Sequence, residues 1–305
     1  MQVRIEISVL ATPPTGAGRR TLEGAVRDLR GRAAAVTGAG SGIGRALAVR
    51  LAREGVRLAL ADIDGEALAE TERALGPGAT VVTRVTDVGD EESVREFADR
   101  AFAAFGEVRL LFNNAGVYMG GRTWTRPAAD FEWTLRVNLW GVLHGVRAFV
   151  PRMIEQGGEG HIVNTCSVAG LFAGPGAAPY TVSKWAAFAA TLSLAQELAL
   201  ENSPLGVSAL CPGGVRTRIH ESERGRPAGL ATEPGEDSAF MEEVIAATVA
   251  GGIPVEDAVE ATLSAVREGR FLVLTHPEYE PGLAEQAEAL AAGRLPRLPD
   301  YEGKG

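Results

Sequence analysis

Short apolar runs alternate with longer amphipathic segments along most of this chain, and this alternation constrains the fold more than any other feature. Strands that alternate with helices form a parallel sheet with helices on both faces. We therefore predict an α/β fold with a single doubly wound parallel sheet of about seven strands. The expected strands are residues 33–37, 56–61, 79–85, 108–112, 161–165, 207–211 and 271–275.

Polar or glycine-rich motifs follow these strands directly. In open parallel sheets, ligands bind beyond the carboxyl ends of the strands. Motifs that follow different strands should therefore meet along one edge of the sheet and form one site. The residues that mark these motifs are Gly38, Asp62, Asp87, Asn114, Ser167 and Pro212.

The first expected strand leads through a glycine-rich turn, from Gly38 to Gly44, into a helix. Glycines let the backbone approach a pyrophosphate, whose charge is favourable at a helix N-terminus, although such a segment can also be a simple turn. Asp62 ends the second strand, where a carboxylate binds the ribose hydroxyls of a dinucleotide and repels a 2′-phosphate. Asp62 could instead be a solvated acid at a strand end. Together the two features predict a Rossmann-type sheet.

Tyr180 and Lys184 are four positions apart at the start of a long apolar helix, so their side chains share one face. A nearby ammonium lowers the pKa of a phenol, and we expect Tyr180 to act as a general acid or base. Ser167, at the end of the fifth strand, can hydrogen-bond a reacting oxygen. An isolated Tyr-x-x-x-Lys pair is common on helix surfaces, so the catalytic interpretation of this pair depends on the other motifs.

The net charge and the cysteine content argue against several classes of protein. The net charge of −9 argues against nucleic-acid binding, and the sequence has no run suited to crossing a membrane. Two cysteines form no disulfide framework, which favours a reduced, cytoplasmic setting. The four histidines have no ligand spacing, so we expect no metal. They are His144, expected to be packed or at a subunit contact, His161, His220, a weak candidate for a substrate contact, and His276.

Over residues 29–278 the sequence resembles the short-chain dehydrogenases/reductases. The glycine-rich turn, the segment Asn113-Asn114-Ala115-Gly116 and the segment from Pro212 to Thr217 are similar to family motifs. The resemblance implies that Tyr180 exchanges a proton with the substrate oxygen, while Lys184 lowers its pKa and binds the nicotinamide ribose. It also implies that Ser167 orients the substrate oxygen and that Asn138 supports a proton-relaying water. The catalytic residues are thus Asn138, Ser167, Tyr180 and Lys184.

The resemblance also implies a cofactor, and we expect NAD. NADP-preferring relatives carry a basic residue at positions that Ser41 and Ile63 occupy here, and Asp62 stands beside them. The expected cofactor-binding residues are Gly38, Ser41, Gly42, Ile43, Gly44, Asp62, Asp87, Val88, Asn114, Ala115, Gly116, Tyr180, Lys184, Pro212, Gly213, Val215 and Thr217.

The expected reaction is hydride transfer between NAD(H) and a secondary alcohol or ketone. Apolar residues after the fourth and fifth strands and in the segment 218–250 suggest an uncharged, lipophilic small-molecule substrate. The alternative is a catalytically silent NAD-binding regulatory or scaffold protein. The apolar candidates are Val117, Tyr118, Met119, residues 168–173, Ile219, Leu230, Phe240 and Met241.

We divide the chain into a flexible N-terminal arm (1–28), a dehydrogenase domain (29–278) and a C-terminal tail (279–305). Within the domain, residues 218–250 form an insertion that we expect to cover the site as a lid. The apolar run Trp185–Ala190 would surround its helix, and the helical segment 129–155 has the same character. We therefore predict a homodimer or homotetramer.

Overall fold

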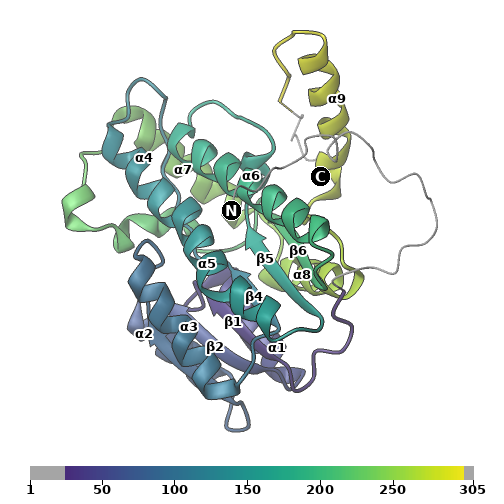
Figure 1. The fold of residues 1–305 in the computed structure, drawn as a ribbon. Helices are drawn as coiled ribbons and strands as arrows, with labels where there is room; N and C mark the ends of the chain where they lie inside the picture. The colour runs from purple at the N-terminus through teal and green to yellow at the C-terminus, as the bar shows by residue number, and fades with distance from the viewer. Residues whose placement is uncertain (1–24, 299–305) are drawn as a thin grey trace, which may run out of the picture.

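A computed structural model of the protein describes residues 25–298 and contains one seven-stranded, fully parallel sheet (Figure 1). Its strand order is β3-β2-β1-β4-β5-β6-β7, which confirms the predicted Rossmann-type arrangement. Residues 1–24 of the expected arm (1–28) lie outside the described residues, as do residues 299–305. The strands are β1 (Ala33–Thr37), β2 (Arg57–Asp62), β3 (Val81–Val85), β4 (Leu110–Asn113), β5 (Gly160–Thr165), β6 (Leu205–Cys211) and β7 (Leu272–Leu274).

The described part of the chain contains nine α-helices, and some of them cover both faces of the sheet (Figure 1). Aspartates cap two of them, since Asp64 accepts backbone N–H groups at the start of α2 and Asp90 does so at α3. The helices are α1 (Gly42–Arg53), α2 (Gly65–Ala74), α3 (Glu91–Phe105), α4 (Ala128–Leu135), α5 (Gly141–Glu155), α6 (Ala178–Leu200), α7 (Glu236–Ala250), α8 (Val255–Glu268) and α9 (Glu280–Ala291).

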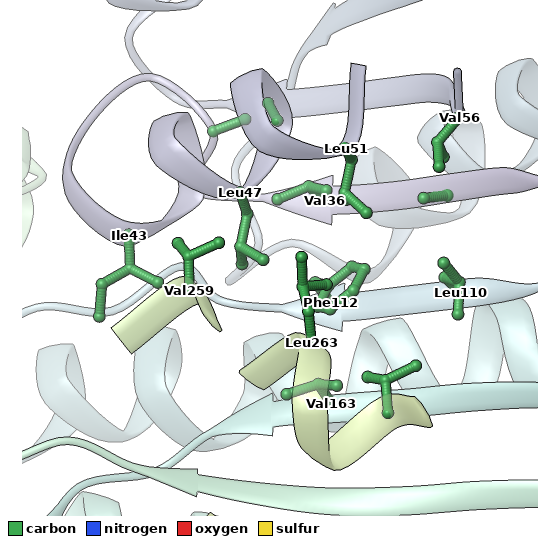
Figure 2. Packing of buried hydrophobic residues seen from close by; sticks show 14 of the residues in the cluster. Val36, Ile43, Leu47, Leu51, Val56, Leu110, Phe112, Val163, Val259 and Leu263 are labelled. Carbon is green, nitrogen blue, oxygen red and sulfur yellow. The ribbon is translucent and has the colours of Figure 1, made fainter. Parts of the chain in front are cut away.

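Successive strand residues point to opposite faces of the sheet and so build two cores. Val36 belongs to the core beneath α1 and α8, together with Leu47 and Leu263 (Figure 2). Its neighbour Ala35 belongs to the opposite core, which α3, α5 and α6 cover with residues such as Phe149. Both faces of the sheet are therefore buried, as parallel sheets require.

The chain changes direction at β1. It runs outward from β1 through β2 to β3 and then returns to β4 on the other side of β1. Val36 of β1 pairs with Phe112 of β4, and Asn113 pairs with Asn164 of β5. The glycine-rich turn after β1 and the asparagine motif after β4 therefore leave the sheet side by side, at the point where such sheets bind ligands.

The long helix expected at 129–155 is interrupted. A π-helical turn, Arg136–Trp140, separates α4 from α5. Such turns carry one extra residue per turn and occur often at functional sites. This turn contains Asn138, which is fully buried. The amphipathic pattern of the sequence does not reveal the interruption because the apolar residues continue through it.

The segments that flank the expected domain are packed onto it where the structure describes them. The Val26 side chain is buried, and its backbone N–H donates to Val266 O at 3.0 Å. At the other end, Gln286 of α9 donates to Leu171 O at 2.8 Å, and the Tyr279 ring lies against Phe172. Ordered packing thus begins before residue 29 and extends past residue 278.

Between residues 25 and 298, no helix combines the length and apolarity needed to cross a membrane. The same part of the chain brings no three His, Cys, Asp or Glu side chains into a group that could hold a metal ion.

Candidate active site

A cavity of about 1080 Å³ lies at the carboxyl ends of the strands. Gly44 and Asn138 lie behind its wall, whereas the other residues expected to act in catalysis or cofactor binding line it. These are Gly38, Ser41, Gly42, Ile43, Asp62, Asp87, Val88, Asn114, Ala115, Gly116, Ser167, Tyr180, Lys184, Pro212, Gly213, Val215 and Thr217.

The glycine-rich turn depends on missing side chains. Gly38 has a φ of +65°, and a Cβ there would stand 2.7 Å from the backbone of Ala115. A Cβ on Gly44 would stand 2.1 Å from Gly38 O, so the turn requires glycine at both positions. Unlike α2 and α3, α1 has no side-chain cap, because Ser41 accepts no N–H. The first N–H groups of α1 are therefore available to an anion.

Asp62 joins the end of β2 to this turn. Its Oδ2 accepts the Gly40 N–H at 2.7 Å, and its Oδ1 accepts the Asp64 N–H at 2.9 Å. Burial raises the pKa of this carboxyl above its usual value, and the two backbone hydrogen bonds oppose the rise. Each oxygen retains a lone pair, so the carboxylate can still accept the hydroxyls of a ribose. The cradle of glycines and this carboxylate fit a dinucleotide.

Asn114 holds three strand ends together. Its Nδ2 donates to Thr37 O at 3.2 Å and to Gly38 O at 3.3 Å. Its Oδ1 accepts the Thr165 hydroxyl at 3.4 Å. The residue thus fixes the ends of β1, β4 and β5 relative to one another, which keeps the floor of the cavity rigid.

Asp87 and Val88 follow β3 at the adjacent wall. Asp87 accepts the Gly89 N–H at 2.8 Å and pairs with Arg136 at 2.7 Å. The carbonyl oxygen of Val88 lies 2.9 Å from His144 Nδ1. His144 is thus packed inside the chain, one of the two places expected for it, and it fixes the loop that presents Val88 to the cavity.

Tyr180, Lys184 and Ser167 lie together as the sequence predicted. Tyr180 is half-buried, and the Ser167 hydroxyl lies close enough to its phenol to affect the pKa of Tyr180. Lys184 is almost completely buried, with its Nζ 5.8 Å from the centroid of the Tyr180 ring. That Nζ donates to Thr165 O at 2.9 Å, which anchors the ammonium to the end of β5.

The pKa of Tyr180 differs from the expectation. Burial raises it to about 12, and the nearby Ser167 hydroxyl opposes this rise. We expected Lys184 to lower it, but burial is the larger influence on Tyr180; burial also lowers the pKa of Lys184, to about 8. The protonated phenol is therefore the resting form at neutral pH.

Asn138 positions the wall next to Lys184. Its Oδ1 accepts the Val117 N–H at 2.8 Å, while its Nδ2 donates to Val117 O at 2.9 Å and to the Ser183 hydroxyl at 2.8 Å. A Cβ on Gly116 would stand 3.2 Å from both Asn138 Oδ1 and Lys184 Nζ. The buried amide therefore connects the loop after β4 to α6 directly beside the lysine.

A buried ionic cluster ties the segment 218–250 to α4. Asp130 is fully buried and pairs with Arg126 and Arg226, each at 2.5 Å. The Thr232 hydroxyl donates to the same carboxylate at 2.8 Å, and Arg226 lies over the Trp133 ring. Burial favours the neutral acid, but the hydrogen bonds from Arg226 and Arg126 outweigh it and keep the pKa of Asp130 below its usual value. The segment is therefore firmly attached to the sheet domain.

The apolar wall differs in part from the expectation. As proposed, the residues that line the cavity include Val117, Tyr118, Val168, Ala169, Ile219 and Met241. Met119, residues 171–173, Leu230 and Phe240 do not line it, and Phe240 is largely exposed to solvent. His220 also lies outside the lining. The residues that the sequence reasoning missed include Val244, Ile245, Thr248 and Val249 of α7, together with Tyr279.

Comparison with known proteins gives a consistent answer. A family model described as short chain dehydrogenase matches residues 32–227. The CLA biosynthesis dehydrogenase/reductase of Lactiplantibacillus plantarum is 32% identical over 284 residues, which cover 91% of this chain and 99% of the relative. The 1-deoxy-11-beta-hydroxypentalenate dehydrogenase of Streptomyces avermitilis is 36% identical over 83% of this chain and 87% of its own.

Among solved structures, a short chain dehydrogenase/reductase from Burkholderia phymatum in complex with NAD superposes with a TM-score of 0.87. It is 40% identical in sequence, and the match covers 90% of this chain and all of that one. The fold, the glycine cradle and these relatives define an NAD-dependent oxidoreductase that acts on CH–OH groups. The chain belongs to the short-chain dehydrogenase/reductase family.

Proposed function

We propose that this enzyme interconverts an uncharged, lipophilic secondary alcohol and its ketone, with Tyr180 as the general acid/base. The observation that carries the proposal is the meeting of the Tyr180 phenol and the Ser167 hydroxyl in one cavity, with the buried ammonium of Lys184 beside them. A substrate oxygen placed between the two hydroxyls receives hydrogen bonds from both. In the reduction the Tyr180 phenol gives its proton to that oxygen, and in the oxidation the phenolate takes the proton back.

Three residues support this proton transfer in our account. Ser167 orients the substrate oxygen toward Tyr180. Lys184, whose burial lowers its pKa to about 8, can exchange a proton near neutral pH and can replenish the tyrosine. Asn138 acts as a positioning residue, since its amide holds the loop at Val117 and the helix at Ser183.

NAD supplies the hydride chemistry when it is bound. We propose that the uncapped N-terminus of α1 and the glycine-rich turn hold its pyrophosphate, with Asp62 on the adenosine ribose and Lys184 on the nicotinamide ribose. The remaining expected cofactor residues line the same cavity, apart from Gly44, whose missing side chain keeps the turn closed.

The charges of the cavity favour an uncharged substrate. Arg218 and Arg224 both pair with Glu221, at 2.5 and 2.9 Å. Arg226 is held by Asp130 and lies over an aromatic ring. Each arginine that lines the cavity thus has a carboxylate partner within the described chain. An anionic tail would have to compete with these carboxylates for the arginines, whereas a neutral group would not.

The wall around the reacting centre is largely apolar. Val117 lies in the loop after β4 and Val168 in the segment after β5. Helix α7 contributes Met241, Val244 and Ile245. The spacing of these α7 residues places them on one face of the helix. An apolar wall with a few convergent polar groups selects an apolar molecule and orients its oxygen.

Initial rates with NAD across a series of 2-alkanols, from 2-butanol to 2-decanol, test this function. A buried methylene contributes about 0.8 kcal/mol, so kcat/KM should rise about fourfold with each early extension of the chain. Hydroxy acids of equal length serve as the charged control and should be poorer substrates. A flat series, or a preference for the hydroxy acids, contradicts the apolar pocket without contradicting the hydride chemistry.

A further inference from the structure

Tyr118 places a second phenol beside the acid–base tyrosine. The centroids of the Tyr118 and Tyr180 rings are 5.0 Å apart, and their planes are inclined at 54°. Tyr118 comes from the loop after β4, whereas Tyr180 comes from α6. The Tyr118 N–H donates to the Ser222 hydroxyl at 2.9 Å, so the segment 218–250 fixes the backbone at this position. The second phenol is therefore held in place from two sides.

The hydroxyl of Tyr118 makes no hydrogen bond with any residue between 25 and 298, although the residue is only 8% exposed. Tyr118 lines the cavity, and its oxygen is not fully enclosed by protein. Buried hydroxyls normally have a hydrogen-bond partner, because leaving one unpaired costs free energy. An unpaired phenol at a cavity wall is available to a ligand that enters the cavity.

Other hydroxyls in this part of the wall are already engaged. Ser222 donates to Ile219 O, and Thr248 donates to Val244 O at 2.8 Å. Burial and the neighbouring Tyr180 raise the pKa of Tyr118 well above the usual value for a phenol. Tyr118 therefore remains a hydrogen-bond donor throughout the working pH range, and unlike Ser222 and Thr248 it has no hydrogen-bond acceptor within the described residues.

The Tyr118 hydroxyl lies close to the segment 218–250. A Cβ on Gly120 would stand 3.2 Å from the Tyr118 hydroxyl oxygen and 2.5 Å from Met241 Cβ. The hydroxyl thus lies where the loop after β4 meets α7, next to the reacting centre marked by Tyr180. Because the two tyrosine rings are neighbours, a substrate bound at Tyr180 can present a second group to the Tyr118 hydroxyl.

We propose that Tyr118 is a specificity-determining residue whose O–H donates a hydrogen bond to a second oxygen of the substrate. This inference rests on the proposed function and refines its substrate class. The preferred substrate is an apolar alcohol or ketone that carries another hydroxyl, carbonyl or ether oxygen one or two carbons from the reacting carbon. The second oxygen leaves the hydride and proton transfers unchanged.

The test compares cyclohexanol with its 1,2- and 1,3-diols, with NAD, in the wild type and in Tyr118→Phe. The measured quantity is the ratio of kcat/KM for each diol to kcat/KM for cyclohexanol. Removing the O–H while keeping the ring should lower this ratio by about tenfold for at least one diol, as expected for one lost hydrogen bond. The pH midpoint of kcat should stay where it is in the wild type.

Two results overturn the inference. One is an equal ratio in the two enzymes, and the other is a shifted pH midpoint, which would mean that Tyr118 acts through Tyr180. NADH binding and thermal melting of the variant confirm that it is folded. If the wild type oxidises neither cyclohexanol nor the diols, the proposed function itself fails and the inference falls with it. That outcome is distinct from turnover with an unchanged ratio.

Discussion

The Asp62 carboxylate accepts the Gly40 N–H at 2.7 Å and so connects the end of β2 to the turn that leads into α1. A Cβ on Gly40 would stand 2.8 Å from the same oxygen, so the contact leaves no room for a side chain. In our account Asp62 has two separable roles. It holds the turn through hydrogen bonds, and its charge selects against a 2′-phosphate.

Two substitutions at Asp62 separate these roles. The wild type should use NAD in strong preference to NADP. Asp62→Asn retains an oxygen for the Gly40 N–H but removes the charge, so the preference should shrink, with a smaller loss of NAD binding than in Asp62→Ala. Asp62→Ala removes both and should lower the affinity for NAD as well. The measurement is kcat/KM for each cofactor, and equal use of both cofactors by the wild type contradicts the assignment.

Alcohol oxidation should rise with pH. Burial raises the pKa of Tyr180 to about 12, so the phenolate that oxidation requires is scarce at neutral pH and increases as protons are removed. Ketone reduction requires the neutral phenol, which is abundant below that pKa, so its rate should change little between pH 6 and 9. Single-turnover rates in both directions at constant ionic strength check this. An oxidation rate that does not depend on pH would remove Tyr180 from the role of base.

The protein should assemble as a homodimer or homotetramer. Trp140 in the π-helical turn, and Val182 and Trp185 on α6, are large apolar side chains with 38–48% of their surface exposed. Burying such side chains against a second copy is favourable. Light scattering at micromolar concentration should therefore give a mass of at least two chains.

A charged residue among these exposed apolar side chains should weaken the assembly. Trp185→Glu should shift the mass toward the monomer. The matched control is Trp124→Glu, because Trp124 is 80% exposed and lies on the turn before α4, outside both α6 and the π-helical turn. A monomeric wild type, or an equal effect of both substitutions, contradicts this prediction.

The sequence predicted the sheet and the place of the site because both depend on local patterns. Each strand is a short apolar run, and motifs such as Asn114 and Ser167 directly follow strands. The parallel register then brings these residues to one edge. Their meeting follows from topology alone, which is why widely separated motifs could be placed together before any contact was known.

Features that depend on contacts between distant segments were not predictable in this way. The cluster of Asp130 with Arg226 joins positions that are 96 residues apart, and no local pattern marks it. The apolar spacing of Met241, Val244 and Ile245 was visible in the sequence, but only the packing of α7 shows that this face lines the cavity. The raised pKa of Tyr180 is likewise a result of burial, which the Tyr-x-x-x-Lys spacing does not report.

The most direct test of the account is Tyr180→Phe, which removes the phenolic O–H and keeps the ring. Turnover of the best alcohol with NAD should fall by roughly a hundred- to ten-thousandfold, the contribution of a positioned acid–base group. The affinity for NADH, measured by fluorescence titration, should stay close to that of the wild type, because the glycine-rich turn and Asp62 are untouched. A Tyr180→Phe enzyme that binds NADH and retains wild-type turnover contradicts the proposed mechanism.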